Sequence, residues 1–163
     1  IGTFTKLEDG FNGTLRTIRR HALGRFAPIG TTDSEYGYCI LLDRLRRRFR
    51  GYPARRRELW AAVAEIGAEL GEHGSFNFLL GDGQHLFARC ATKLCYLVRK
   101  APFGLAQLAD DDVRIDFSTV TTPRDRVAVV ATAPLTVNET WTMGRPNELW
   151  VFDTGTLRAT LPS

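Results

Sequence analysis

The sequence has few of the residues that bind metals or form disulfides. Its 163 residues include three cysteines (Cys39, Cys90 and Cys95) and three histidines. The number of cysteines is odd, and no two of them have the spacing of a zinc site. We therefore expect reduced thiols, as in the cytoplasm, and neither a metal nor a cofactor.

Long apolar runs are also missing. No run approaches the roughly 18 residues that a membrane-spanning helix needs. The first residues do not form the basic-then-apolar pattern of a secretory leader. The hydrophobic share of 44% and the charged share of 25% are typical of a globular domain. These features predict a cytoplasmic protein without a membrane partner, folded as a single domain over residues 1–163.

Arginine is abundant, and it clusters where two predicted helices meet. Such a cluster can contact nucleic-acid phosphates, or it can form a solvated, salt-bridged helix face. Asp43 and Glu58 lie inside the cluster, and the nearby Phe49 and Tyr52 fit a packing role. We favour the helix face and expect no nucleic-acid partner. The cluster comprises Arg44, Arg46, Arg47, Arg48, Arg50, Arg55, Arg56 and Arg57.

The apolar pattern changes along the chain from a helical period to a strand period. Apolar residues three and four apart predict helices over residues 34–49 and 54–70, after a shorter helix over 14–23. From Phe76 onward the period is two, which is typical of strands joined by tight turns. Helices followed by antiparallel strands predict an α+β fold. Strands are expected over residues 1–7, 76–80, 85–90, 94–99, 113–117, 126–132, 149–153 and 156–160.

A polar segment, Gly30-Thr31-Thr32-Asp33-Ser34-Glu35, lies where a proline–glycine loop enters the first long helix. Thr32, Asp33 or Ser34 can cap the first free N–H groups, and the two acidic side chains suit the positive end of the helix dipole. The same arrangement makes a small polar pocket, in which one carboxylate can hold the charged end of an amino acid. The residues alone leave both interpretations open.

Two further motifs have a structural and a catalytic interpretation. Asn12-Gly13 is typical of a turn, although an Asn amide beside a Gly N–H can also form an oxyanion hole. His85 and Cys90 can be considered as a catalytic pair, but residues five apart on a strand point to opposite faces. We favour a histidine beside a turn and a buried thiol. Cys39, among apolar helical neighbours, is expected in the core.

Five stretches of the chain form an ordered set: residues 11–13, 28–35, 76–83, 119–123 and 134–141. Together they resemble the class II glutamine amidotransferases, and most closely the branch that includes the ergothioneine-pathway γ-glutamyl hydrolases. The resemblance runs from about Phe11 to the end of the chain. It implies an N-terminal-nucleophile hydrolase fold, an αββα sandwich of antiparallel sheets between helices.

The resemblance also implies a mechanism and site residues. An N-terminal cysteine thiolate attacks the side-chain amide of glutamine or of a γ-glutamyl compound, its own α-amino group acts as the base, and water releases glutamate from the thioester. Asn12 and Gly13 match the oxyanion-hole pair. Asp33 matches the carboxylate that binds the substrate α-ammonium group, and Thr32 and Ser34 support that loop.

The chain departs from the family pattern at its start. Phe11 stands where the family usually has a histidine, and the eleven residues before Asn12 contain no cysteine. We therefore expect the nucleophile and the first strands to come from a missing N-terminal segment or from another chain, as in a homo-oligomer. This chain is then the C-terminal portion of an amidotransferase-like domain, inactive by itself. The alternative is a non-catalytic amino-acid-binding or structural domain that retains the fold.

Overall fold

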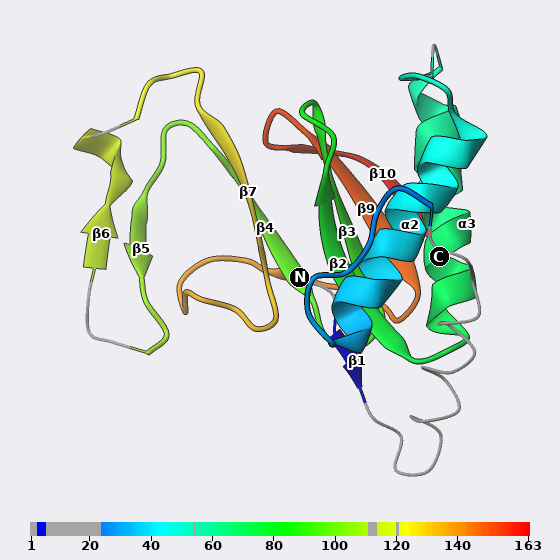
Figure 1. Ribbon diagram of the computed structural model, residues 1–163. Coiled ribbons are helices and arrows are strands. Elements are labelled where there is room, and N and C mark those ends of the chain that lie inside the picture. The colour runs from blue at the N-terminus through cyan, green and yellow to red at the C-terminus, as the bar shows by residue number, and fades with distance from the viewer. Residues whose placement is uncertain (1–2, 6–23, 54, 111–113, 120) are drawn as a thin grey trace.

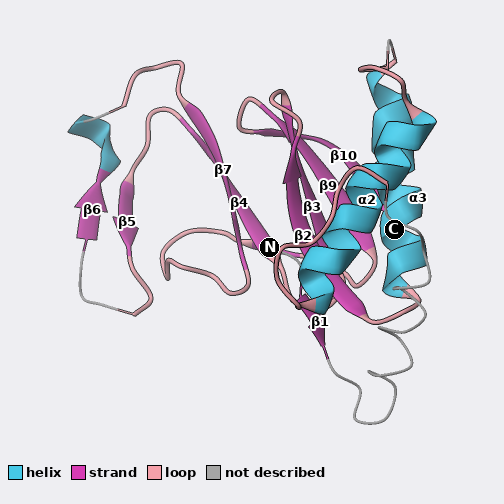
Figure 2. Ribbon diagram, viewed as in Figure 1, coloured by secondary structure: helices cyan, strands magenta, loops and turns pink. Residues whose placement is uncertain are grey.

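The computed structural model of the chain describes residues 3–5, 24–53, 55–110, 114–119 and 121–163. Two long helices are followed by a series of antiparallel strands, which confirms the predicted α+β class (Figures 1 and 2). The elements are β1 (Thr3–Thr5), α2 (Asp33–Arg48), α3 (Arg56–Gly71), β2 (Ser75–Gly81), β3 (His85–Cys90), β4 (Cys95–Lys100), β5 (Leu105–Gln107), β6 (Arg114–Asp116), η1 (Phe117–Thr119), β7 (Arg126–Ala131), β8 (Thr142–Met143), β9 (Glu148–Asp153) and β10 (Thr156–Pro162).

The described elements form three layers. The first layer is the helix pair, which lies on one face of a five-stranded sheet with the order β1-β2-β3-β9-β10 (Figure 1). A second sheet, β7-β4-β8, covers the opposite face. The two-stranded pair β5–β6 projects away from the helices (Figure 1). Both described helices therefore cover the same side of the sandwich.

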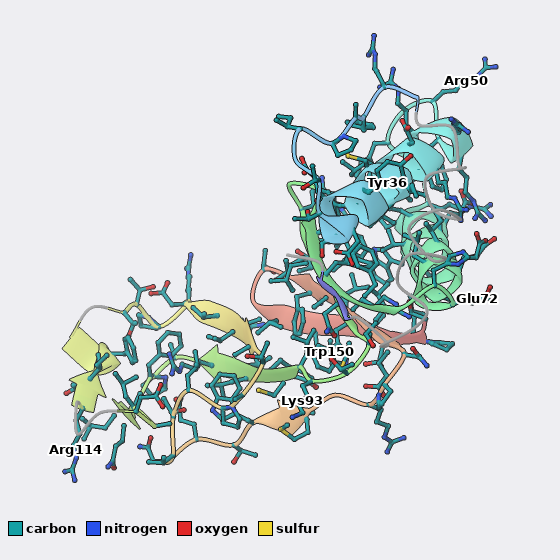
Figure 3. All side chains as sticks on the ribbon, turned by 60° about the horizontal axis from the view of Figure 1, so that its bottom comes forward. Tyr36, Arg50, Glu72, Lys93, Arg114 and Trp150 are labelled. Atoms are coloured by element: carbon teal, nitrogen blue, oxygen red, sulfur yellow. The ribbon has the colours of Figure 1, made fainter. Side chains whose placement is uncertain are left out.

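Side chains along β3 and β9 point alternately to the two faces of the five-stranded sheet, and they form one core on each face. Phe87 and Val151 are paired across these strands and pack toward the helices with Leu41 and Leu70. Their neighbours in sequence point the other way, as strand geometry requires. Trp150 lies in this second core, between the two sheets (Figure 3). The other residues buried there are Ala88, Cys90, Leu94 and Phe152.

Salt bridges connect the two helices on their exposed side. Arg44 pairs with Glu69, and Arg48 pairs with Glu65 at 2.5 Å. The arginine cluster therefore contributes to a salt-bridged helix face, as expected, but its acidic partners are on α3. Asp43 has a different role from the one expected, because its carboxylate accepts the N–H groups of Gly24 and Arg25. The hydrogen bond from Gly24 is the main reason that the pKa of Asp43 lies below its ordinary value.

A buried arginine on β3 connects the sheet to Ser163 and lies against helix α3. Arg89 is 1% exposed and donates to Phe76 O at 2.8 Å, to Ser163 Oγ at 3.0 Å and to two further oxygens. Burial lowers its pKa. A Cβ atom at Gly71 would lie 2.4 Å from this guanidinium group, so glycine allows the helix to approach it. All three nitrogens of the guanidinium donate hydrogen bonds, so this buried cation has partners inside the protein.

The stretch 134–141 has a structural role at the base of the β5–β6 pair. Glu139 binds Arg99 through two hydrogen bonds of 2.7 and 2.6 Å, and it also accepts the Thr136 hydroxyl. The hydrogen bonds from Arg99 are the main reason that the pKa of Glu139 is lowered. The guanidinium of Arg99 lies 4.7 Å from the centre of the Phe117 ring. This network fixes the second sheet against the projecting pair.

Most predicted elements appear within one or two residues of their expected bounds. The strands β5 and β8 are not among the expected strands. The helix expected over residues 14–23 lies outside the described residues. No helix in the described ranges is long and apolar enough to cross a membrane.

Candidate functional site

The first turn of α2 carries the residues that the sequence singled out. Thr32 is the N-cap, with an extended backbone, and its hydroxyl accepts the N–H of Glu35 at 3.3 Å. The carboxylate of Glu35 accepts the N–H groups of Ile29 and Gly30, each at 2.8 Å. Of the three possible caps, Thr32 therefore fills the position. The expected capped helix is confirmed.

Asp33 directly follows the cap, and its two carboxylate oxygens differ. Oδ1 accepts the N–H of Ser34 at 2.7 Å and the Ser34 hydroxyl at 3.2 Å. Oδ2 is buried and has no hydrogen-bond partner among the described residues. A buried carboxylate oxygen without a donor costs free energy, so such groups are normally paired. Asp33 therefore presents one oriented acceptor at the positive end of a helix.

The proposed oxyanion-hole pair, Asn12 and Gly13, lies outside the described residues, so its role stays a prediction. The nearest described element before it is β1, which pairs with β2 through Phe4 and Phe76. β1 lies beside the beginning of α2 (Figure 1). The chain therefore passes close to the Asp33 end of the helix shortly before it reaches Asn12.

The three cysteines lie in the core, as expected for Cys39 and Cys90. All three thiols are free and buried. Burial is the main cause that raises the pKa of each thiol, and it thereby disfavours the thiolate. None of them is placed to act as an exposed nucleophile. The described part of the chain also holds no group of three or more metal-ligating side chains.

A second polar cluster lies at the other end of α2, and the sequence did not reveal it. His85 is 3% exposed, and its Nδ1 lies 3.0 Å from Asp82 Oδ2 and 3.3 Å from the Tyr52 hydroxyl. Its ring meets Trp60 edge to face, with ring centroids 5.5 Å apart. Cys90 lies in the core between the sheets, so the expected separation of His85 from Cys90 is confirmed. Tyr52 is 33 residues from His85, and no local pattern links them.

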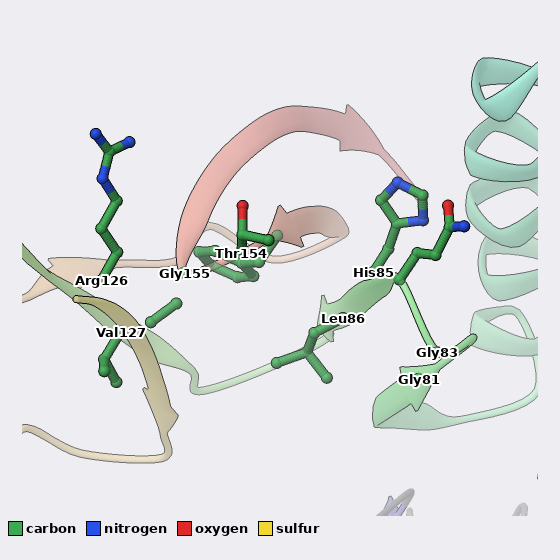
Figure 4. A pocket seen from close by; sticks show the side chains of 11 residues that line it. Gly81, Gly83, His85, Leu86, Arg126, Val127, Thr154 and Gly155 are labelled. Atoms are coloured by element: carbon green, nitrogen blue, oxygen red, sulfur yellow. The ribbon is translucent and has the colours of Figure 1, made fainter. Parts of the chain in front are cut away.

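The two polar clusters are well separated. A helix of 16 residues spans about 24 Å, and Asp33 begins α2 whereas Tyr52 follows its end. In Figure 3, Tyr36 marks the first turns of α2 and Arg50 marks the far end. A cavity of about 430 Å³ opens beside the second cluster, between two hairpin turns (Figure 4). It is lined by Gly81, Gly83, His85, Leu86, Val127 and Gly155, among others.

Comparison with known proteins gives consistent results. A family model described as "Glutamine amidotransferases class-II" matches residues 10–163. The chain is 44% identical over 144 residues to the "Putative glutamine amidotransferase YafJ" of Escherichia coli K12, covering 88% of this chain and 56% of that protein. It is 41% identical over 131 residues to a "Putative glutamine amidotransferase" of Haemophilus influenzae, covering 80% of this chain and 44% of that protein.

A solved structure extends the similarity to the fold. The crystal structure of a "predicted glutamine amidotransferase" from Pseudomonas aeruginosa matches with a TM-score of 0.76 and 37% identity, over 98% of this chain and 58% of that one. The chain thus spans about half the length of the proteins that it matches.

Proposed function

Because the chain belongs to the family of class II glutamine amidotransferases, we propose that it forms the substrate-binding part of an enzyme that hydrolyses the side-chain amide of glutamine or of a γ-glutamyl compound. In this reaction water replaces the amine, and the products are glutamate and ammonia or a free amine. The observation that carries the proposal is the buried Oδ2 of Asp33, which has no hydrogen-bond partner in the described part of the chain.

The geometry of Asp33 fits an ammonium ligand. Oδ1 is held by the Ser34 N–H and hydroxyl, which fixes the plane of the carboxylate. An α-ammonium group brings three N–H donors, so it can satisfy Oδ2 through a charge-assisted hydrogen bond. Thr32 and Ser34 then act as supports of Asp33, as the resemblance implied.

The proposal assigns the nucleophile to a cysteine that is not among residues 1–163. Cys39, Cys90 and Cys95 are buried thiols with raised pKa values, so they do not supply a thiolate. The proposed nucleophile is an N-terminal cysteine of the full-length protein, upstream of residues 1–163. Asn12 and Gly13 are proposed to stabilise the oxyanion that forms on the amide oxygen.

The test is release of ammonia from glutamine by the full-length protein, with and without Asp33→Asn. We expect activity in the wild type and a loss of roughly 100-fold in kcat/KM in the variant. Asp125→Asn is a matched control, because Asp125 also accepts a backbone N–H and a hydroxyl, both from Thr122. Equal activity of the wild type and Asp33→Asn would contradict the role of Asp33.

One observation favours a second candidate, a non-catalytic amino-acid-binding domain. All three thiols of the chain are buried, so the proposed binding group, Asp33, has no accessible thiol nucleophile in this chain. The two candidates differ in one measurement. A binding domain takes up glutamine or glutamate without releasing ammonia, whereas the hydrolase releases ammonia stoichiometrically with glutamate.

A further inference from the structure

We propose that Glu35 is a positioning residue, whose carboxylate holds the loop before α2 in the conformation that presents Asp33. This inference rests on the proposed function of Asp33 as the ammonium-binding group. It concerns a residue that makes no contact with the substrate and acts through the backbone of residues 29–35.

Three hydrogen bonds connect Glu35 to earlier residues of the segment 29–35. Its Oε1 accepts the N–H of Ile29 at 2.8 Å, and its Oε2 accepts the N–H of Gly30 at 2.8 Å. Its own N–H donates to the Thr32 hydroxyl at 3.3 Å. Asp33 lies between Thr32 and Glu35 in the sequence, so the closed segment contains it. The backbone that carries Asp33 is therefore fixed from both sides by one residue.

The two acidic residues of the motif consequently have different roles. Both oxygens of Glu35 are occupied by backbone donors. Asp33 uses Oδ1 for Ser34 and keeps Oδ2 without a partner among the described residues. A charged ligand can therefore pair with Asp33 without breaking an existing bond, whereas pairing with Glu35 would release the loop.

At Ile29 and Gly30, the loop is held by hydrogen bonds and not by apolar burial. The Ile29 side chain is fully exposed, so it gives the loop no apolar attachment. A Cβ atom at Gly30 would lie 2.8 Å from Glu35 Oε2, which is closer than such contacts normally allow. Glycine at this position thus permits the close approach of the carboxylate to the backbone. The Glu35 carboxylate therefore lies directly against the backbone of Gly30.

A simple helix-capping role does not account for these contacts. In a capping box the acid at the third helical position binds the N–H of the cap residue itself. Glu35 instead reaches the N–H groups of residues five and six positions earlier. Its interaction with the helix dipole remains, and Glu58 provides the comparison, because it is the acidic residue in the first turn of α3.

The experiment compares Glu35→Ala, Glu35→Gln and the control Glu58→Ala in the full-length protein. The first readout needs no ligand and is the hydrogen exchange of the Ile29, Gly30 and Ser34 amides. We expect Glu35→Ala to speed exchange at all three amides by at least 10-fold. Glu35→Gln, which keeps one acceptor oxygen, should give an intermediate effect, and Glu58→Ala none.

The second readout is the kinetics of ammonia release from glutamine. We expect Glu35→Ala to raise KM by about 10-fold while kcat stays within about threefold, with partial rescue by Glu35→Gln. Unchanged exchange in Glu35→Ala would overturn the positioning role, and so would faster exchange with an unchanged KM. A wild type that neither binds nor hydrolyses glutamine would instead refute the proposed function, while the exchange data would still decide whether Glu35 holds the loop.

Discussion

Asp33 and Asp82 are two aspartates at opposite ends of the helical layer, and both accept backbone N–H groups. Asp82 uses both oxygens fully. Oδ1 accepts the N–H groups of Gln84 and His85 at 2.8 and 2.6 Å, and Oδ2 accepts the Tyr52 hydroxyl at 2.9 Å and His85 Nδ1 at 3.0 Å. Asp33 leaves Oδ2 without a donor among the described residues.

This difference separates a structural carboxylate, Asp82, from the carboxylate that we propose binds a ligand, Asp33. Each donor to Asp82 comes from the protein itself, so the group stabilises the turn between β2 and β3 and connects it to Tyr52. Because a carboxylate only accepts, Nδ1 of His85 carries the proton in this pair. Asp33 is the same residue type and begins α2, but it retains capacity for an external donor. The comparison predicts opposite responses to mutation.

The largest effect is expected for Asp33→Asn. The substitution removes the charge that pairs with an α-ammonium group, so affinity for glutamate should fall by about 100-fold, or about 3 kcal/mol. The free energy of unfolding without ligand should change by less than about 1 kcal/mol, because Oδ1 can still accept from Ser34. Calorimetric titration and urea denaturation measure the two quantities. A large loss of stability with unchanged affinity would reverse the assignment.

Asp82→Ala should show the opposite pattern. The substitution leaves the His85 N–H, His85 Nδ1 and the Tyr52 hydroxyl without their acceptor, in a region where His85 is buried. We expect a loss of about 2–3 kcal/mol in the free energy of unfolding. Glutamate affinity should stay within threefold of the wild type under conditions where the variant is folded. Denaturant titration followed by ligand binding checks both, and an affinity loss as large as that of Asp33→Asn would contradict the comparison.

The pH dependence of stability provides a smaller and independent test. Burial raises the pKa of Asp82, but the hydrogen bonds from His85, Gln84 and Tyr52 together outweigh it, so the pKa lies below its ordinary value. The unfolded value is about 3.9, so the stabilisation is complete above about pH 5 and is lost as the pH falls through the folded pKa. The stability difference between the wild type and Asp82→Asn should therefore shrink below about pH 4. If the stability difference between the wild type and Asp82→Asn stays constant from about pH 7 to 3, the lowered pKa of Asp82 does not contribute to stability.

Tyr52→Phe should have the smallest effect. It removes one hydroxyl donor to Asp82 and leaves the other three hydrogen bonds in place. Because Tyr52 is about half exposed, water can replace part of the interaction, and we expect a loss of about 0.5–1 kcal/mol. Thermal unfolding of Tyr52→Phe and of Asp82→Ala measures the ratio of their two losses in stability. If Tyr52→Phe lost as much stability as Asp82→Ala, the Tyr52 hydrogen bond alone would account for the stabilising effect of Asp82.

The same comparison shows which features a sequence can predict. The start of α2 was predictable because its signals are local: a Thr cap and two acids stand within four residues. The Asp82 network was not, because Tyr52 and Trp60 approach His85 only after α3 packs on the sheet. The acidic partners of Arg44 and Arg48 were missed for the same reason, since Glu69 and Glu65 lie on the other helix. Asp33 Oδ2, which has no partner among residues that the structure describes, likewise acquires its surroundings only in the folded chain.

The central claim is that Asp33 Oδ2 binds an α-ammonium group. Isothermal titration of the full-length protein with L-glutamate and with glutarate tests it directly, because the two ligands differ only in the α-amino group and neither has an amide to hydrolyse. We predict that the wild type binds glutamate about 100-fold more tightly than glutarate and that Asp33→Asn abolishes this preference. A preference that persists in Asp33→Asn, or equal binding of both ligands by the wild type, would contradict the assignment.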